Sequence, residues 1–200
     1  MDVIDFYKSL IADHLSKRSN SCWMDPIVKY TLTQKKIEDA IYIAVMSRDK
    51  TGRKHSHQWR IYDHVYENFS QNLLNVRDKI ENSKNFDELL NIIDEEKPSG
   101  AGELFCYDTA VRIGHYLNLF PEKIYLHAGT RKGLEALLKR KIYGKTINKN
   151  NLPEPFKSCK LSPGQLEDFF CIYKEYLSGN RMDIKQLKEF GIIYKNIPTC

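Results

Sequence analysis

The chain has 200 residues, of which 42% are hydrophobic and 28% are charged, and its formal net charge is +5. This composition excludes a disordered chain and allows one globular domain with a sizeable core, or two small lobes that share one. No apolar run approaches the length of a bilayer span, and three aspartates near the start are unlike a secretory signal. We expect a cytoplasmic monomer with no membrane contact.

Two amphipathic helices are predicted in the first quarter of the chain. Apolar residues repeat at helical spacing from residue 2 to residue 17. A second helix is predicted from Thr33, a suitable N-cap, through Met46. Helical spacing continues through most of the remaining sequence, so the predicted fold is a single all-α domain spanning residues 1–200.

Segment 47–60, SRDKTGRKHSHQWR, is predicted to be a functional loop. It holds five basic residues around a single glycine and has little apolar material to bury. Arg53 and Lys54 are candidates for binding DNA phosphates. His57, Gln58 and Trp59 offer hydrogen bonds and a stacking surface to an unpaired or flipped base.

Two simpler interpretations of this segment stay open. Ser56 can cap a long amphipathic helix, predicted to run to residue 82, with Trp59 as its first core residue. His55 and His57 can both bind a metal, but no third ligand lies near them in the sequence. We therefore expect no metal and no cofactor.

Stretch 85–119 combines a helix, a Pro/Gly-rich turn and a second helix. Asn85 and Glu88 are spaced as an N-cap and its reciprocal partner, and Gly100 and Gly102 precede the second helix. Unpaired N–H groups at such a helix start can bind an anion. Together with the sequence TAVRI at 109–113, this pattern resembles the hairpin of helix-hairpin-helix DNA-binding proteins, in which a Gly-x-Gly turn holds a DNA phosphate. A plain tight turn with a C-capping glycine is the alternative.

The resemblance covers residues 85–138 and includes the DNA glycosylases of that superfamily, which implies base excision. Those enzymes carry a catalytic aspartate in a segment after the hairpin, where this chain has no aspartate. Cleavage of an N-glycosidic bond needs a carboxylate near the anomeric carbon and a group that orients water or protonates the base. Asp108 and His127 are the candidates, with Tyr107 beside the base. Asp108 can instead pair with Arg112, four residues on.

Positive charge is concentrated after the hairpin. Residues 121–160 hold ten Lys/Arg and three Asp/Glu, whereas residues 61–97 hold four and nine. Thr130 is predicted to cap a helix with Arg131 and Lys132 in its first turn, where positive charge is unfavourable unless an anion binds there. These three residues are therefore predicted to contact DNA phosphate. A solvated basic surface is the alternative.

Segment 125–131, YLHAGTR, has a weaker resemblance to the strand that holds nicotinamide in ADP-ribosyltransferases. That resemblance implies a β-rich core. Further along, Ser162, Pro163 and Gln165 predict the start of a helix. The five cysteines show no Cys-x-x-Cys pairing and predict reduced, mostly buried thiols.

Taken together, these patterns predict a protein that binds DNA, as a duplex with a flipped base or as a single strand, and excises a damaged or modified base. The main alternative is a helix-hairpin-helix module that binds nucleic acid without chemistry. An ADP-ribosyltransferase-like enzyme is the third interpretation.

Overall fold

The structure is a computed structural model that describes residues 3–18 and 25–178, so Cys22 and Cys200 lie outside the described residues. The chain packs as two compact units. Unit 1 is formed by Met1–Trp23 and Glu122–Cys200, and unit 2 is formed by Met24–Pro121. Unit 2 is thus inserted into the sequence of unit 1, whereas the sequence analysis treated the chain as one domain.

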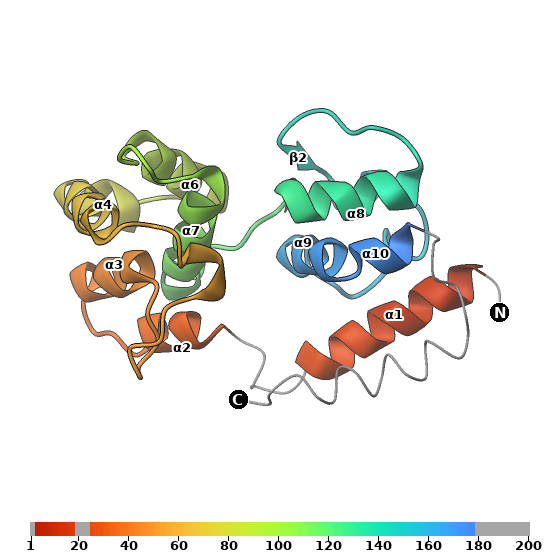
Figure 1. The fold of residues 1–200 in the computed structure, drawn as a ribbon, viewed down its shortest axis with the longest axis horizontal. Helices are drawn as coiled ribbons and strands as arrows, with labels where there is room; N and C mark the ends of the chain where they lie inside the picture. Colours follow the sequence, from red (N-terminus) through yellow and green to blue (C-terminus); the bar gives the residue numbers. More distant parts are fainter. Residues whose placement is uncertain (1–2, 19–24, 179–200) are drawn as a thin grey trace. The chain divides into compact units, whose positions relative to one another are not determined.

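The described residues are mostly α-helical (Figure 1). The helices of unit 2 are α2 (Pro26–Leu32), α3 (Ile37–Met46), the short 3-10 helix η2 (Ser56–Gln58), α4 (Asp63–Asn75), α5 (Arg77–Glu81), α6 (Phe86–Glu95) and α7 (Glu103–Leu117). Helix α7 packs against α2, α3 and α6, and Ala110 and Ile113 on it are completely buried. It is therefore the central helix of unit 2.

Helix α2 was not predicted, and the prediction that Thr33 begins a helix is wrong. Asp25 caps α2, because its Oδ1 accepts a hydrogen bond from the N–H of Ile27 at 2.9 Å, and Pro26 occupies the first turn. Thr33 is the C-cap of α2, and its hydroxyl donates to the carbonyl of Tyr30. An Asp-Pro start signal therefore places a helix where the sequence analysis left a connection.

The predicted helix from residue 56 to 82 is divided into η2, α4 and α5. The break after η2 has a cause in its backbone carbonyls. The Tyr66 hydroxyl donates to the carbonyl of Gln58 at 2.7 Å, and the Lys54 ammonium donates to the carbonyl of Ile61 at 3.1 Å. The Gln58 carbonyl also accepts the N–H of Ile61 at 3.2 Å, in place of the Tyr62 N–H that a continuous α-helix would bring to it.

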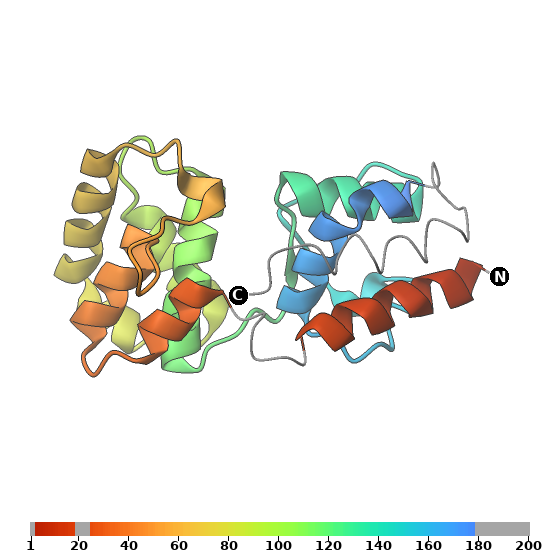
Figure 2. The ribbon, with the colours of Figure 1, turned by 60° about the horizontal axis from the view of Figure 1, so that its bottom comes forward.

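Unit 1 is built from α1 (Val3–Arg18), β1 (Ile124–Tyr125), α8 (Ala128–Leu138), β2 (Thr146–Ile147), the 3-10 helix η3 (Lys149–Asn151), α9 (Pro163–Ile172) and α10 (Lys174–Leu177). Helix α8 packs against α9 and α10, and α1 lies along this layer (Figures 1 and 2). Phe156, Phe169 and Phe170 are fully buried in its core. The predicted capping box of Ser162 and Gln165 at the start of α9 is confirmed.

Strand content is small in the residues that the structure describes. Strands β1 and β2 form one antiparallel pair, with Ile124 opposite Ile147. The following segment is helical from Ala128, so the β-rich core implied by the ADP-ribosyltransferase resemblance has no counterpart in residues 3–18 and 25–178. None of the described helices has both the length and the apolar character that a membrane crossing requires.

Candidate functional site

The fold brings the predicted loop to the predicted carboxylate. Asp108 lies in the second turn of α7, and its Oδ2 accepts a hydrogen bond from Nε2 of Gln58 at 2.9 Å. The two residues are 50 positions apart in the sequence. The basic loop, defined here as residues 47–62, therefore meets α7 at Asp108 within unit 2.

Arg112, one turn further along α7, holds the base of the loop. Its side chain is 1% exposed, and Nη1 donates to Oγ of Ser47 at 2.7 Å and to the carbonyl of Ala44 at 3.1 Å. Nη1 also lies 3.5 Å from Oε1 of Gln58. The same guanidinium thus contacts the end of α3 and the side chain that bonds to Asp108.

Arg112 forms its ion pair with Asp25, at 3.4 Å, and not with Asp108. The helical pairing of Asp108 with Arg112, which the sequence left open, is thus absent from the described structure. Asp108 instead receives the amide of Gln58. Its carboxylate is consequently oriented without being neutralised by a direct cation contact.

Two histidines of the loop lie beside this carboxylate. One ring nitrogen from each of His55 and His57 and one oxygen of Asp108 all lie within 4.8 Å of one another. The rings of His55 and His57 meet edge to face, with centroids 5.0 Å apart. Nδ1 of His55 is buried and has no hydrogen-bond partner among the described residues.

Burial sets the protonation of this cluster. Burial raises the pKa of Asp108 to about 6, although the positive charges of Arg112 and His57 oppose the rise. Burial, together with the positive charge of Arg112, lowers the pKa of His55 to about 4. At neutral pH His55 is therefore a neutral imidazole with a free lone pair.

The outer surface of the basic loop is positively charged. Lys50, Arg53 and Arg60 are exposed, and no hydrogen bond or ion pair of these side chains occurs among the described residues. Trp59 is 67% exposed and Tyr62 is 74% exposed. Trp59 is thus not the core residue that the alternative interpretation required, and it offers a free aromatic face.

Three predicted site residues have other contacts in the structure. Lys54 bonds to the carbonyl of Ile61 and lies 4.4 Å above the ring of Tyr66, so it is not a free phosphate ligand. The amide of Gln58 is occupied by Asp108, which leaves it less suited to contact a base. Tyr107 is buried against Phe86, in the core of unit 2, so it does not line an open base pocket.

The Gly-x-Gly turn has an acidic surrounding. Gly100 has a φ of +93°, and the N–H of Ala101 closes a tight turn onto the carbonyl of Pro98 at 3.1 Å. Gly102 is exposed and precedes α7. Four carboxylates lie between residues 94 and 103, and the one lysine there, Lys97, pairs with Asp94 at 2.7 Å. The turn thus offers backbone N–H groups in a negative field, which weakens the case for a phosphate there.

The predicted residues His127 and Thr130 belong to unit 1, and the cluster around Asp108 is built without them. The prediction that Thr130 caps a helix is wrong, because α8 begins at Ala128 with His127 as its N-cap. Thr130 lies inside the helix and is fully buried. Its hydroxyl donates to the carboxylate of Glu167 at 2.7 Å, which accounts for this side chain without an anion.

The neighbouring basic residues of α8 also have internal partners. Arg131 donates to the carbonyls of Ile142 at 2.6 Å and Gly144 at 2.7 Å, so it holds the connection that follows α8. Lys132 pairs with Glu175 of α10 at 2.7 Å. These contacts account for the positions of both side chains, so no bound anion is needed to explain them.

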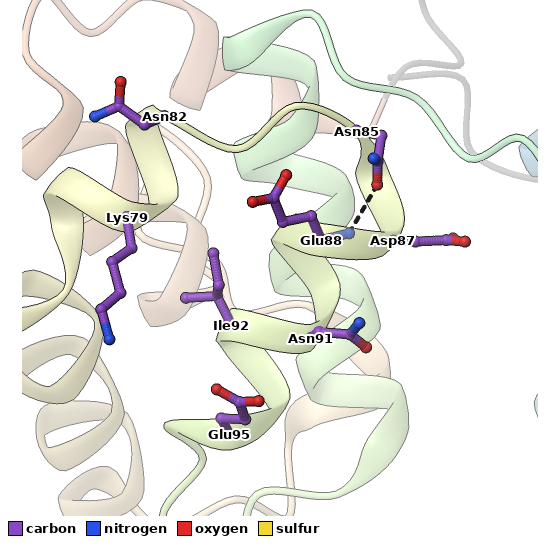
Figure 3. Close-up of a pocket in the computed structure, with 8 residues that line it drawn as sticks. All are labelled: Lys79, Asn82, Asn85, Asp87, Glu88, Asn91, Ile92 and Glu95. Atoms are coloured by element: carbon purple, nitrogen blue, oxygen red, sulfur yellow. Dashed lines mark hydrogen bonds between the residues drawn. The ribbon is translucent and has the colours of Figure 1, made fainter.

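A surface hollow of about 610 Å³ lies elsewhere on unit 2, between α5 and α6. Figure 3 shows that Asp87, Glu88 and Glu95 of α6 line it, with Lys79 of α5 on the opposite side. Three carboxylates against one ammonium make this surface a poor site for a polyanion. None of the predicted site residues lines this hollow.

Sequence reasoning missed several residues that build the cluster. Asp25, Ser47 and Tyr66 hold Arg112 or Gln58 from three different elements. The contacts of Asp25 and Ser47 with Arg112 span 87 and 65 positions, and Tyr66 contacts Gln58 across eight, and no local pattern marks any of them. The polar residue Asp25 before Pro26 is a local signal for a helix start, but not for an ion pair with α7.

Two of the thiols that the structure describes are buried enough to be unreactive. Cys106, Cys159 and Cys171 are free, and burial raises the pKa of Cys106 to about 11. Burial also raises the pKa of Cys171. These two cysteines are consequently protonated at neutral pH and poor nucleophiles.

Comparison of the chain with protein-family models, with curated proteins and with solved structures found no match.

Proposed function

We propose that the protein binds DNA through the basic loop of unit 2 and excises a damaged or modified base with the help of Asp108. The observation that carries this proposal is the 2.9 Å hydrogen bond between Gln58 and Asp108. This hydrogen bond places a carboxylate that can act on a nucleotide next to a loop whose positive charge can bind that nucleotide. The resemblance to DNA glycosylases, found in the sequence alone, points to the same activity.

The loop has the features of a nucleic-acid contact. Lys50, Arg53 and Arg60 are exposed cations that can each neutralise a phosphate, and this contact supplies affinity without reading sequence. Trp59 adds an exposed aromatic face on which an unpaired base can stack. We therefore assign the phosphate contacts to this loop rather than to the acidic Gly-x-Gly turn.

Asp108 and His57 have the chemistry for cleavage of an N-glycosidic bond. The sugar gains positive charge as the bond to the base breaks, and a nearby carboxylate stabilises this charge. Water supplies the oxygen that replaces the base at the sugar carbon, and the base leaves with a proton. His57 is exposed beside Asp108 and can orient the water or transfer the proton.

Removing two loop cations is expected to weaken DNA binding in a salt-dependent way. In a Lys50→Gln, Arg53→Gln variant, the slope of log affinity against log salt should fall by about 2, because two phosphate contacts are lost. Fluorescence anisotropy with labelled duplex and single-stranded oligonucleotides, over a salt series, measures this slope.

The matched control removes the same charge from the other end of α3. Lys35 and Lys36 are exposed and precede α3, whereas the loop follows it, so about 15 Å of helix separates the two pairs. A Lys35→Gln, Lys36→Gln variant should keep the wild-type slope. If the slope fell equally in both double variants, only the net charge of the protein would matter for DNA binding. The loop would then not be the binding surface.

Replacing Asp108 by asparagine is expected to abolish base excision and to preserve DNA binding. The amide keeps the size of the side chain but loses the negative charge, so we expect a rate loss of at least about 100-fold. Oligonucleotides that each carry one modified base, assayed for abasic sites, measure the activity. Asp39→Asn, at an exposed position of α3, is the control and should retain full activity. Binding of every oligonucleotide by the wild type without cleavage of any would instead indicate a non-catalytic binding module.

A further inference from the structure

We propose that His55, His57 and Asp108 form a binding site for one divalent transition-metal ion, with zinc as the ion of best fit. The sequence offered only two neighbouring histidines. The fold adds a carboxylate from α7, and the three ligand atoms lie within 4.8 Å of one another. Two imidazoles and one carboxylate are a common ligand set for a zinc ion that keeps an open position for water.

The two imidazoles and one of the two Asp108 oxygens are not occupied by partners among the described residues. Neither imidazole forms a hydrogen bond to a described residue, and Nδ1 of His55 is buried without a partner. A buried ring nitrogen without a partner is costly, because it has lost water and gained nothing. This unpartnered atom belongs to one of the three ligand residues and is an observation independent of the spacing of the cluster.

The carboxylate is already oriented by a neighbour. Gln58 donates to Oδ2 of Asp108, which leaves Oδ1 available. Gln58 is itself fixed, because its backbone carbonyl accepts the Tyr66 hydroxyl at 2.7 Å and its Oε1 faces Arg112. Metal ligands in proteins are oriented in this way by outer hydrogen bonds.

The distances allow an ion after a small closing movement. Zinc binds imidazole nitrogen at about 2.0–2.1 Å in a tetrahedral arrangement, so its ligand atoms lie about 3.4 Å apart. In the cluster the three ligand atoms lie within 4.8 Å of one another. His57 is exposed on its short 3-10 helix, and rotation of its side chain can supply the remaining approach.

The type of ligand selects the ion. Imidazole nitrogen suits zinc and the other late first-row metals, whereas calcium and magnesium require mostly oxygen ligands. The positive charge of Arg112 next to the cluster is offset by its ion pair with Asp25. The site therefore presents two imidazole nitrogens and one carboxylate oxygen to the ion.

Metal binding does not rest on the proposed function, because the ligands are all protein side chains. Where both hold, an ion held by His55, His57 and Asp108 would supply Lewis-acid activation of water at the site. The titrations below contain no DNA, so their failure is distinct from a failure to bind or cleave DNA.

The test is titration of the full-length, chelator-treated protein with Zn²⁺ by calorimetry, and with Co²⁺ by absorption spectroscopy. We expect one equivalent per chain and a rise in the melting temperature with zinc. His57→Ala and Asp108→Asn should each weaken binding by at least about 100-fold, since even outer partners of metal ligands are worth about 10- to 100-fold. Circular dichroism of both variants checks that they are folded.

His64→Ala is the matched control, because His64 is an exposed histidine of the same unit that stacks on Tyr62 outside the cluster. It should bind zinc as the wild type does. A wild-type protein that binds no zinc, or a loss in His64→Ala equal to that in His57→Ala, overturns the proposal. A thiolate-to-cobalt charge-transfer band also overturns it, because the bound ion would then lie on cysteines.

Discussion

Replacing Arg112 by leucine is expected to destabilise unit 2 by about 2–4 kcal/mol, because removal of one member of a buried ion pair leaves the other groups without a partner. Asp25 would lose its cation, and Ser47, Gln58 and the carbonyl of Ala44 would lose a donor. The Asp25 side chain is 28% exposed, so water can replace the guanidinium there and reduce the loss of stability toward the lower end of this range.

Hydrogen exchange followed by mass spectrometry measures this effect separately in each unit. Peptides from α3 and α7 should exchange faster in the variant, and peptides from α8 and α9 should not. Arg77→Leu is the control, since Arg77 forms a surface pair with Glu38 at 3.3 Å that is worth at most about 1 kcal/mol. A change in Arg112→Leu no larger than in this control would show that the buried network contributes little to stability.

Gly133→Ala is expected to destabilise unit 1 by about 2–3 kcal/mol, after a gain of about 1 kcal/mol in helix propensity. A Cβ at this position of α8 would lie 2.1 Å from the carbonyl oxygen of Phe170 in α9. Backbone atoms cannot rotate away, so the two helices must separate and open the core between them. Exchange rates of α8 and α9 peptides measure the loss.

Two other glycines give a graded comparison. A Cβ at Gly129 would meet the Sγ of Cys171 at 2.4 Å, and a side chain can turn aside, so Gly129→Ala should cost less than Gly133→Ala. A Cβ at Gly102 meets nothing within 4 Å, and Gly102→Ala should leave unit 1 unchanged. An equal effect at all three positions would refute close packing of α8 on α9 as the cause.

The sequence predicted the helical class well, because amphipathic spacing and caps are local features. Asn85 accepts the N–H of Glu88 at 2.9 Å, as its spacing indicated. The boundary after residue 56 failed where side chains seven and eight residues away bind the backbone. The carbonyls of Gln58 and Ile61 are taken by Tyr66 and Lys54, and helical periodicity carries no trace of such contacts.

The candidate site could be predicted only in part. The loop and Asp108 were each found from residue type, and their meeting depends on the packing of α7 against α3, which sequence spacing does not encode. Arg131 and Lys132 show that residue type can also point to a site that the structure explains otherwise. Their positive charge suggested an anion, but α8 begins earlier than predicted and both side chains have protein partners.

The insertion of unit 2 has a consequence for the nascent chain. Tyr7 of α1 packs on Phe156 with ring centroids 5.3 Å apart, and Asp13 accepts the Tyr173 hydroxyl at 2.7 Å. The ribosome must therefore translate all of unit 2 before α1 can reach these partners. Because domains generally fold as units during translation, unit 2 can complete its core first. Helix α1 can pack only after the C-terminal part of unit 1, with Phe156 and Tyr173, has been synthesised.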